Sequence, residues 1–256
     1  MAVNVYGMDG SVKGSVELPS VFSAPLRPEV IRRAVLSEAS FRLQPQGHSV
    51  VAGMQTSARY YGRVHSYRSG RHMGRAIRPR QKLGGGVQGD VRRIPSSTKG
   101  RRAHPHMVGK TIAERMNRKE YLLALSSAIA ATAPAKQAAP FVVSDSIESV
   151  KKTKDIMQVF DKLGLSEKIS RSHDPSIGRS RYAVRRHFKS ALLFVVGKEC
   201  DAIKAARNIP GVEACVVTKI SVGKLAPGGN PGIRALWSED AVKSVEGAIT
   251  KINMGK

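Results

Sequence analysis

Apolar and polar positions alternate at the start of the chain, and then the spacing becomes helical. Residues 3–18 alternate around Asp9-Gly10, a dipeptide that tolerates the positive φ of a tight turn, so they predict two short strands joined as a hairpin. After Pro28, apolar residues recur three and four positions apart, which predicts a helix that ends before Pro45. From Pro45 to about Arg115 the chain shows no hydrophobic period.

The second half of the chain alternates strand and helix signals. Asn117 and Glu120 predict a capping box that opens a helix. The further expected elements are a strand at 141–143, a helix capped by Ser146 and stopped by Gly164, a strand at 191–196, a helix at 201–208, strands at 214–217 and 233–237, and a last helix capped by Ser238. This alternation predicts an α/β fold with a mostly parallel sheet and helices on its faces.

The segment without a hydrophobic period carries much of the chain's charge. The chain has 43 Lys+Arg against 19 Asp+Glu, a formal net charge of +24 at pH 7. Between Gln55 and Pro105 lie thirteen of those cations, eleven of them arginine, and a single acid, Asp90. So few apolar residues cannot form a core. We therefore expect one α/β domain, residues 1–256, with an extended arm inserted at residues 45–115 and ordered by what it binds.

Structured RNA is the partner that this charge predicts. Arginine offers a planar fork to phosphate and stacks on bases, so its excess over lysine favours RNA over a merely solvating tail. A membrane surface is disfavoured because the arm has no amphipathic apolar face, whereas a disordered loop that binds any polyanion loosely is the simpler alternative. A second basic cluster, residues 171–189, is a loop by composition and is expected to contact RNA as well.

The residues expected to bind RNA are all basic and come from the arm and from this second cluster. They are Arg59, Arg63, His65, Arg68, Arg71, Arg75, Arg78, Arg80, Lys82, Arg92, Arg93, Lys99, Arg101, Arg102, His104, Arg179, Arg181, Arg185 and Arg186. Glycines between them are expected to let the chain turn inside RNA grooves that a β-carbon would block, Gly100 among them.

Motifs that could carry chemistry lack the structural context that such chemistry needs. Three glycines between positions 84 and 89 have a dinucleotide-binding spacing, but no buried strand precedes them and no helix follows. Gly109-Lys110-Thr111 resembles the end of a phosphate-binding loop, yet no hydrophobic strand leads into it. The histidines have no cysteine or acid at zinc-like spacing. We expect no catalytic residue, no metal and no cofactor.

Composition also limits the compartment. Cys200 and Cys215 are too few for a disulfide framework, which is typical of a reducing compartment, and both are expected to be core thiols. No apolar stretch approaches the roughly 18 residues that would span a bilayer. Residues 1–20 have no cationic start followed by an apolar core, so they are not expected to be a signal peptide. We expect a cytoplasmic protein.

Two runs of the sequence resemble a known family. Lys99-Gly100-Arg101-Arg102-Ala103-His104-Pro105, and Leu225-Ala226-Pro227-Gly228-Gly229 with Pro231-Gly232, look like large-subunit ribosomal protein four in its archaeal and eukaryotic form. The resemblance extends over almost the whole chain. The long C-terminal extension usual in eukaryotic cytoplasmic members is lacking, so we expect an archaeal source.

The resemblance implies a Rossmann-like three-layer domain with a long loop that penetrates ribosomal RNA. In that family the loop tip helps to line the nascent-peptide exit tunnel, and by position the tip here would be Arg68, Arg71, His72 and Arg75. The implied partners are large-subunit ribosomal RNA, neighbouring large-subunit proteins and the nascent peptide, with no membrane and no small-molecule substrate. The implied role is a structural constituent of the subunit that supports its assembly.

Two other classes of protein compete with this interpretation. One is an RNA-modifying enzyme, such as a methyltransferase, that holds its substrate with the basic arm. Its sheet would need a glycine-rich turn after the first parallel strand, but Phe141-Val142-Val143 is followed by Ser144-Asp145-Ser146. The other class is an architectural DNA-binding protein, which would bind duplex DNA without associating with ribosomal subunits.

Overall fold

The computed structural model describes residues 2–60, 78–83, 88–133, 142–166, 169, 176–179, 184–187 and 189–254. The chain divides into two compact units. Unit 1 comprises Met1–Arg42 with Ala113–Lys256, and unit 2 comprises Leu43–Ile112.

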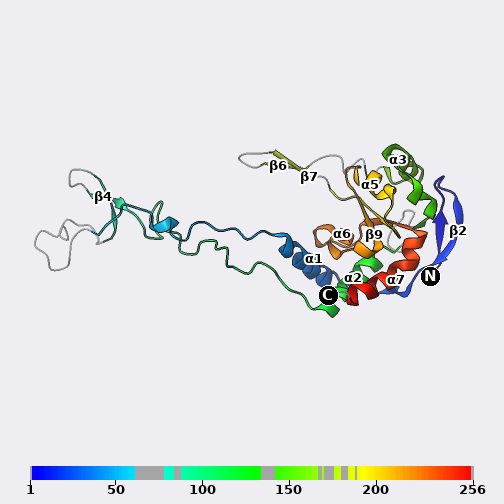
Figure 1. The fold of residues 1–256 in the computed structure, drawn as a ribbon, viewed down its shortest axis with the longest axis horizontal. Coiled ribbons are helices and arrows are strands. Elements are labelled where there is room, and N and C mark those ends of the chain that lie inside the picture. Colours follow the sequence, from blue (N-terminus) through cyan, green and yellow to red (C-terminus); the bar gives the residue numbers. More distant parts are fainter. Residues whose placement is uncertain are drawn as a thin grey trace, which may run out of the picture. The chain divides into compact units, whose positions relative to one another are not determined.

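Unit 1 is built on a six-stranded sheet. Its strands are β1 (Ala2–Tyr6), β2 (Val12–Glu17), β5 (Val142–Val143), β8 (Leu192–Val196), β9 (Val212–Val216) and β10 (Arg234–Ser238). They lie in the order β2-β1-β5-β10-β8-β9, and the two outer strands, β2 and β9, are labelled in Figure 1. Only the β1–β2 pair is antiparallel, and the other neighbours in this sheet are parallel. The predicted α/β fold with a mostly parallel sheet is confirmed.

Helices connect and cover these strands. The α-helices are α1 (Pro28–Arg42), α2 (Arg118–Ala131), α3 (Thr153–Lys162), α5 (Asp201–Arg207), α6 (Val222–Leu225) and α7 (Glu239–Met254). Short 3-10 helices are η1 (Ser20–Ser23), η2 (Ala52–Met54), η4 (Asp145–Ser149), η5 (Val217–Lys219) and η6 (Pro227–Gly229). No helix in the described ranges is long and apolar enough to cross a membrane.

Alternating side chains of the buried strands build a core on each face of the sheet. Leu193 and Val195 of β8 belong to the cluster that includes residues of α1, α2, α6 and α7. Their neighbours Leu192 and Phe194 belong to the cluster under α3, α5 and η4. Figure 1 shows α3 and α5 on the opposite side of the sheet from α1 and α2. Helices therefore pack on both faces, as the continuous apolar run at 191–196 predicted.

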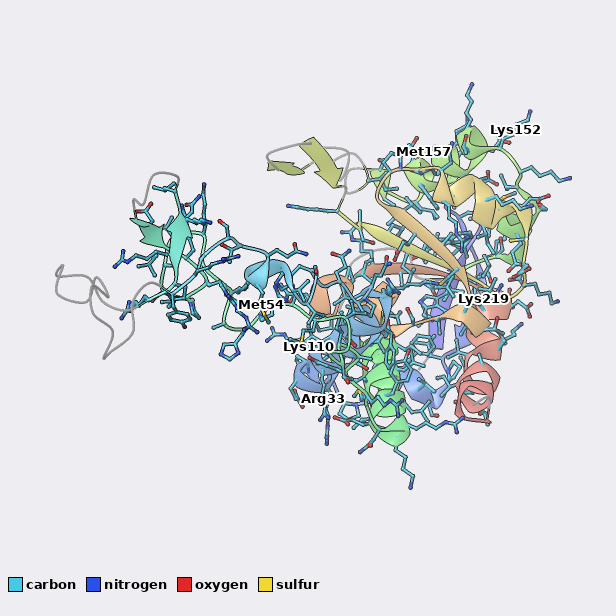
Figure 2. All side chains as sticks on the ribbon, turned by 60° about the vertical axis from the view of Figure 1, so that its left-hand side comes forward. Arg33, Met54, Lys110, Lys152, Met157 and Lys219 are labelled. Atoms are coloured by element: carbon cyan, nitrogen blue, oxygen red, sulfur yellow. The ribbon has the colours of Figure 1, made fainter. Side chains whose placement is uncertain are left out.

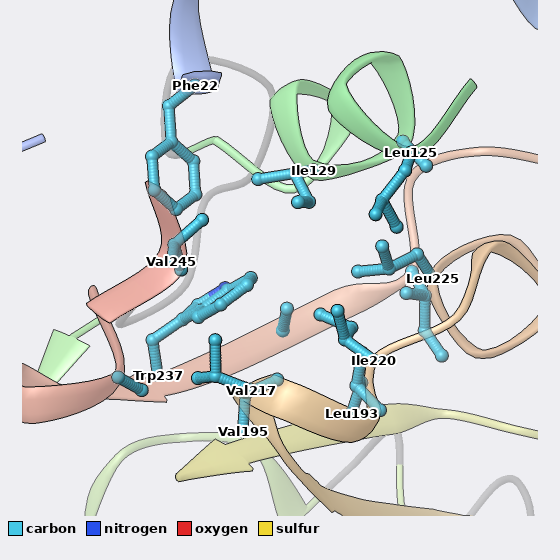
Figure 3. Close-up of a cluster of buried hydrophobic side chains, with 14 of the residues drawn as sticks. Phe22, Leu125, Ile129, Leu193, Val195, Val217, Ile220, Leu225, Trp237 and Val245 are labelled. Atoms are coloured by element: carbon cyan, nitrogen blue, oxygen red, sulfur yellow. The ribbon is translucent and has the colours of Figure 1, made fainter. Parts of the chain in front are cut away.

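Trp237 of β10 is at the centre of the first cluster. Its side chain is fully buried, and the Phe22 ring meets it edge-on with the ring centroids 5.4 Å apart. Figure 3 shows Val195 of the neighbouring strand and Val245 of α7 beside the indole. Edge-to-face aromatic pairs add about 1 kcal/mol to the free energy of burial. This packing joins η1, near the start of the chain, to the last strand and helix.

The hairpin predicted around Asp9-Gly10 is confirmed. The Gly7 amide donates to the Ser11 carbonyl over 2.8 Å, and Gly10 has a φ of +80°. A Cβ at Gly10 would lie 3.0 Å from the Lys162 carbonyl oxygen at the end of α3. Both the backbone conformation and the close approach therefore require glycine at this turn.

The helix predicted from Ser146 to Gly164 is wrong at its start and confirmed at its end. Residues 145–149 form η4, and α3 begins only at Thr153. At the other end Gly164 has a φ of +69°, its amide donates to Asp161, and the amide of Leu165 donates to Phe160. These two bonds form a Schellman stop.

Tertiary hydrogen bonds explain the break between η4 and α3. The Asp145 carboxylate accepts from the Asp240 amide over 2.9 Å, and the Glu148 carboxylate accepts from the Gly197 amide over 3.1 Å. These bonds tie the segment to the ends of β10 and β8. The Ser146 hydroxyl instead contacts the Ser144 hydroxyl, so it does not cap a helix.

Three further expectations need correction. Asn117 is the N-cap residue of α2, but its side chain makes no capping hydrogen bond, and Glu120 pairs with Arg33 over 2.7 Å instead. Part of the loop predicted at 171–189 is an antiparallel strand pair, β6 (Ser176–Arg179) and β7 (Val184–His187). Unit 2 also contains such a pair, β3 (Arg80–Lys82) and β4 (Gln88–Val91). Neither pair shows an apolar alternation in its sequence, so the hydrophobic pattern did not predict it.

Candidate nucleic-acid interface

The described part of unit 2 presents a dense set of exposed cations. Arg92 and Arg80 are half-buried. The exposed members are Arg59, Arg78, Lys82, Arg93, Lys99, Arg101, Arg102 and His104. Figure 2 shows long side chains with nitrogen tips projecting from the ribbon around the teal strands of this unit. Asp90 is its single acid, and it lies 3.9 Å from Arg92. The exposed cations have no carboxylate partner among the described residues.

Several predicted RNA-binding residues, or their side chains, lie outside the described part of the chain. Arg63, His65, Arg68, Arg71, His72, Arg75 and Arg181 lie outside the described residues, as do Gly84 and Gly86 of the dinucleotide-like spacing. Arg179 is on β6, and Arg185 and Arg186 are on β7; their side chains are also outside the described part.

Backbone pairing brings arginines together at the base of β3. The Arg59 amide donates to the Arg80 carbonyl over 3.0 Å, and the Arg80 amide returns a bond of 2.9 Å. Two residues paired in this way are direct cross-strand neighbours, and like charges at such positions repel. A bound phosphate would relieve this repulsion, so the pairing favours a polyanionic partner.

A tight turn holds two further cations. The Ser97 amide and hydroxyl both donate to the Ile94 carbonyl, over 3.1 and 2.9 Å. Arg92 donates from Nη1 to the Thr98 carbonyl over 2.9 Å. The turn is flanked by Arg93 and Lys99, which have positive φ values of 70° and 56°. Non-glycine residues in this conformation carry backbone strain, which is commonly found at binding sites.

This turn borders a cavity of about 820 Å³ within unit 2. Arg93, Lys99 and Arg102 line it, and so do His48 and His106. No acid is among its lining residues. The His48 ring nitrogen Nδ1 lies 3.3 Å from the His106 carbonyl oxygen, which brings together the segments before and after the arm's middle. A concave, cationic surface of this size suits phosphate and a stacked base.

Two glycines in the described part of unit 2 lie where the chain approaches itself closely. A Cβ at Gly100 would overlap the Ile94 carbonyl oxygen, and one at Gly89 would lie 2.8 Å from the Gln81 carbonyl oxygen. Close approach of the chain to itself therefore explains both glycines. This internal packing is by itself a sufficient reason for glycine at position 100.

Hydrogen bonds in unit 1 join the residues that flank unit 2 in the sequence. The Ser37 hydroxyl of α1 donates to the Glu114 carbonyl over 2.6 Å, and the Glu114 amide donates to the Ser40 hydroxyl over 2.9 Å. Both serines are buried, and the apolar periodicity of this helix does not mark them. The residues that precede and follow unit 2 are thus held together by unit 1 itself.

Glu38 is the centre of a second link at the same place. Its Oε1 accepts from the Tyr121 hydroxyl over 2.7 Å and from the Val222 amide over 2.9 Å, while Oε2 accepts from the Gly223 amide over 3.0 Å. Burial and the adjacent carboxylate raise the pKa of Tyr121 above its usual range, so the phenol stays a donor. Glu38 thereby joins α1, α2 and α6. No sequence signal distinguishes it from an ordinary surface glutamate.

The carboxyl ends of the parallel strands are where enzymes with such sheets bind nucleotides. Here that edge carries the carboxylates of Asp145, Glu148 and Asp240, and the first two already accept backbone amides. A Cβ at Gly197, directly after β8, would lie 2.7 Å from the Asp240 carboxylate. The protein's own acids thus occupy this edge, where Lys198 pairs with Asp240 over 3.5 Å. This arrangement argues against a nucleotide-dependent enzyme.

The two cysteines and the phosphate-loop resemblance can also be placed. Cys215 is buried, and burial raises the pKa of its thiol to about 11, as expected for a core thiol. Cys200 is only half-buried. Gly109-Lys110-Thr111 precedes α2 by several residues and follows no strand, so its resemblance to a phosphate-binding loop is a chance match.

Comparison with known proteins identifies the family. The model of the ribosomal protein L4/L1 family matches residues 16–248. The chain is 40% identical to the large ribosomal subunit protein uL4 of Methanococcus aeolicus, over 96% of this chain and 98% of that protein. It is 38% identical to the protein of the same name from Archaeoglobus fulgidus, over 95% of this chain and 97% of that protein. These matches confirm the resemblance seen in the two sequence runs, and the chain belongs to the ribosomal protein L4/L1 family.

Proposed function

We propose that the chain is a structural constituent of the large ribosomal subunit and that unit 2 binds ribosomal RNA. The observation that carries this proposal is the set of exposed cations of unit 2, gathered around strained backbone and a cationic cavity, with a single acid in the unit. Charges placed so closely repel one another unless a polyanion neutralises them. The relatives are named large ribosomal subunit protein uL4, and we therefore identify this polyanion as ribosomal RNA.

The finer features of the fold belong to the same proposal. We infer that unit 1 is a Rossmann-like three-layer domain and that residues 45–115 form an extended arm inserted in it. The boundaries of the two compact units, near residues 42 and 113, support this division. The arm's tip, with Arg68, Arg71, His72 and Arg75, would reach the peptide exit tunnel, and cations on the stem would let ribosomal RNA helices approach each other.

The RNA-modifying enzyme is not supported. The family is one of structural ribosomal proteins, not of enzymes. The acidic carboxyl edge of the sheet gives the physical reason, because Asp145, Glu148 and Asp240 occupy the place where a nucleotide cofactor would bind.

Sedimentation tests the proposed function. Native lysate containing the tagged protein is centrifuged through a sucrose gradient at high salt, which removes loosely held cationic proteins. We expect the protein to remain with large subunits at about one copy each. Recovery at the top of the gradient would contradict the proposal and would favour a loose polyanion binder or a DNA-binding protein.

The hairpin of β6 and β7 is the second proposed RNA contact. Replacing Arg185 and Arg186 by glutamate is expected to weaken binding to ribosomal RNA about tenfold and to flatten its salt dependence, because two phosphate contacts are lost. The double change Lys152→Glu and Lys154→Glu, at the exposed N-cap and first turn of α3, alters the charge equally and serves as the control. Filter binding over a range of salt concentrations measures both effects. An unchanged salt slope relative to the control would count against this contact.

A further inference from the structure

A cavity of about 310 Å³ lies at the amino-terminal edge of the sheet in unit 1, among residues that none of the RNA predictions includes. β8 and β10 are parallel neighbours, with Arg234 opposite Leu192, so the segments that lead into them lie side by side. The cavity forms between Ser190, ahead of β8, and the loop 227–233, ahead of β10. Its volume is near the lower limit for ligand sites and suits a phosphate with its sugar.

Two polar groups of the cavity lack internal partners. The Ser190 hydroxyl oxygen is buried and has no hydrogen-bond partner in the described part of the chain. Nearly all buried hydroxyl groups in proteins are bonded, so such a group calls for an explanation. Arg234 is half-buried, and none of the ion pairs among the described residues involves it. The lining contains no Asp or Glu.

The loop that closes the cavity owes its shape to glycine. Gly228, Gly229 and Gly232 have φ values of +68°, +81° and +101°. A Cβ at Gly228 or Gly232 would meet nothing within 4 Å, so backbone conformation, and not crowding, requires glycine at both. Gly232 lines the cavity and leaves its backbone open to a ligand.

Charge distinguishes this edge of the sheet from the opposite one. The carboxyl edge carries Asp145, Glu148 and Asp240, as described above. The amino edge carries the exposed Lys189 next to Ser190, and Arg234 at the start of β10. Lys198 offsets part of the acidic charge at the carboxyl edge by pairing with Asp240, whereas an anion at the cavity meets two cations and no lining acid.

We propose that this cavity binds one phosphodiester of ribosomal RNA. The Arg234 guanidinium pairs with two phosphate oxygens, and the Ser190 hydroxyl donates a hydrogen bond to the same group. This inference rests on the proposed function and extends it, since it gives unit 1 a preformed RNA contact of its own. The loop 227–233 is then a binding element and not only a connection between α6 and β10.

Binding of the full-length protein to transcribed large-subunit ribosomal RNA tests the site. Arg234→Gln is expected to weaken binding about fivefold and to lower the salt slope by about one, because one phosphate contact is lost. Ser190→Ala is expected to weaken binding about threefold with an unchanged slope, since it removes no charge. Arg234→Lys should restore the slope but not the full affinity, because an ammonium group cannot form the two-pronged contact.

Lys152→Gln is the matched control, because it removes one exposed charge that does not line the cavity. If Arg234→Gln behaves like this control while thermal melting shows both variants folded, the proposal is overturned. Phosphorus NMR with inorganic phosphate and uridine monophosphate distinguishes the sources of phosphate. Binding of these small anions that is lost in Arg234→Gln, with RNA binding unchanged, would also overturn it. If the wild-type protein binds ribosomal RNA with no higher affinity than it binds heparin, the proposed function itself is refuted.

Discussion

Removing residues 55–105 is expected to leave unit 1 folded and to abolish stable incorporation into large ribosomal subunits. The two core clusters of unit 1 contain no residue from unit 2, so the deletion removes none of their packing. The hydrogen bonds of Ser37 and Ser40 with Glu114 stay in place and hold the ends of the deletion together. Thirteen of the chain's cations are lost, and with them most of the proposed phosphate contacts.

The deletion can be closed without strain. The retained segments approach each other within unit 2, because a Cβ at Gly47 would lie 2.9 Å from the Val108 amide nitrogen. A short Gly-Ser linker between Met54 and His106 therefore suffices. Circular dichroism melting measures the fold of unit 1, and sucrose gradients of cells that express the tagged variant measure incorporation.

A second variant separates the charge of the arm from its length. Arg92, Arg93, Arg101 and Arg102 are changed to glutamine in an arm of full length. If charge is what the subunit recognises, this variant is also expected to incorporate poorly, at less than about a tenth of the wild-type level. Normal incorporation of the deleted chain would refute the role assigned to unit 2.

Local signals in the sequence sufficed for some elements. The continuous apolar run at 191–196 marked a strand buried on both faces, the stop at Gly164 needs only the residues of one turn, and both are confirmed. The break before Thr153 could not be predicted, because Asp145 and Glu148 are held by amides that lie far along the chain. The pairs β3–β4 and β6–β7 were missed since their strands show no apolar alternation.

The candidate site also has features that the sequence could predict and features that depend on the fold. Charge density alone marked the cations of unit 2, since thirteen cations against one acid is a property of composition. The positive φ at Arg93 and Lys99 and the cavity beside them depend on how the chain folds back, which composition does not encode. Arg234 and Ser190 were not predicted, because an arginine at the start of a strand is ordinary in sequence. Only the pairing of β8 with β10 brings these two residues to one cavity.

Replacing Glu38 by alanine is expected to lower the free energy of unfolding of unit 1 by about 3 kcal/mol. The carboxylate accepts three hydrogen bonds, and its loss leaves the donors of Tyr121, Val222 and Gly223 without that partner in a partly buried site. Each bond to a charged group is worth about 1.5–3 kcal/mol, and partial exposure reduces the sum. For a unit of this size the melting temperature should fall by roughly 6–12 °C.

Two further variants test whether the loss of stability comes from the three hydrogen bonds of Glu38 or would follow from any substitution in helix α1. Tyr121→Phe removes one bond and should cost about 1 kcal/mol. Glu29→Ala, at an exposed position in the first turn of the same helix, should cost less than about 1 kcal/mol. A loss in Glu38→Ala no larger than that in Glu29→Ala would show that the link is not structural.

Because of its position near the ends of unit 2, Glu38 is expected to affect incorporation into subunits as well as stability. Helix α1 ends at Arg42, directly before unit 2, and α2 begins at Arg118, shortly after it, and Glu38 is bonded to both α2 and α6. Without it, the residues that flank unit 2 would lose one of their links, while the bonds of Ser37 and Ser40 with Glu114 and the Arg33–Glu120 pair remain. We therefore expect Glu38→Ala to incorporate more slowly than its folded fraction predicts, whereas Tyr121→Phe should follow its folded fraction. Pulse-labelled gradients at a temperature well below melting compare the two rates. Equal rates for Glu38→Ala and wild type would restrict Glu38 to a role in stability.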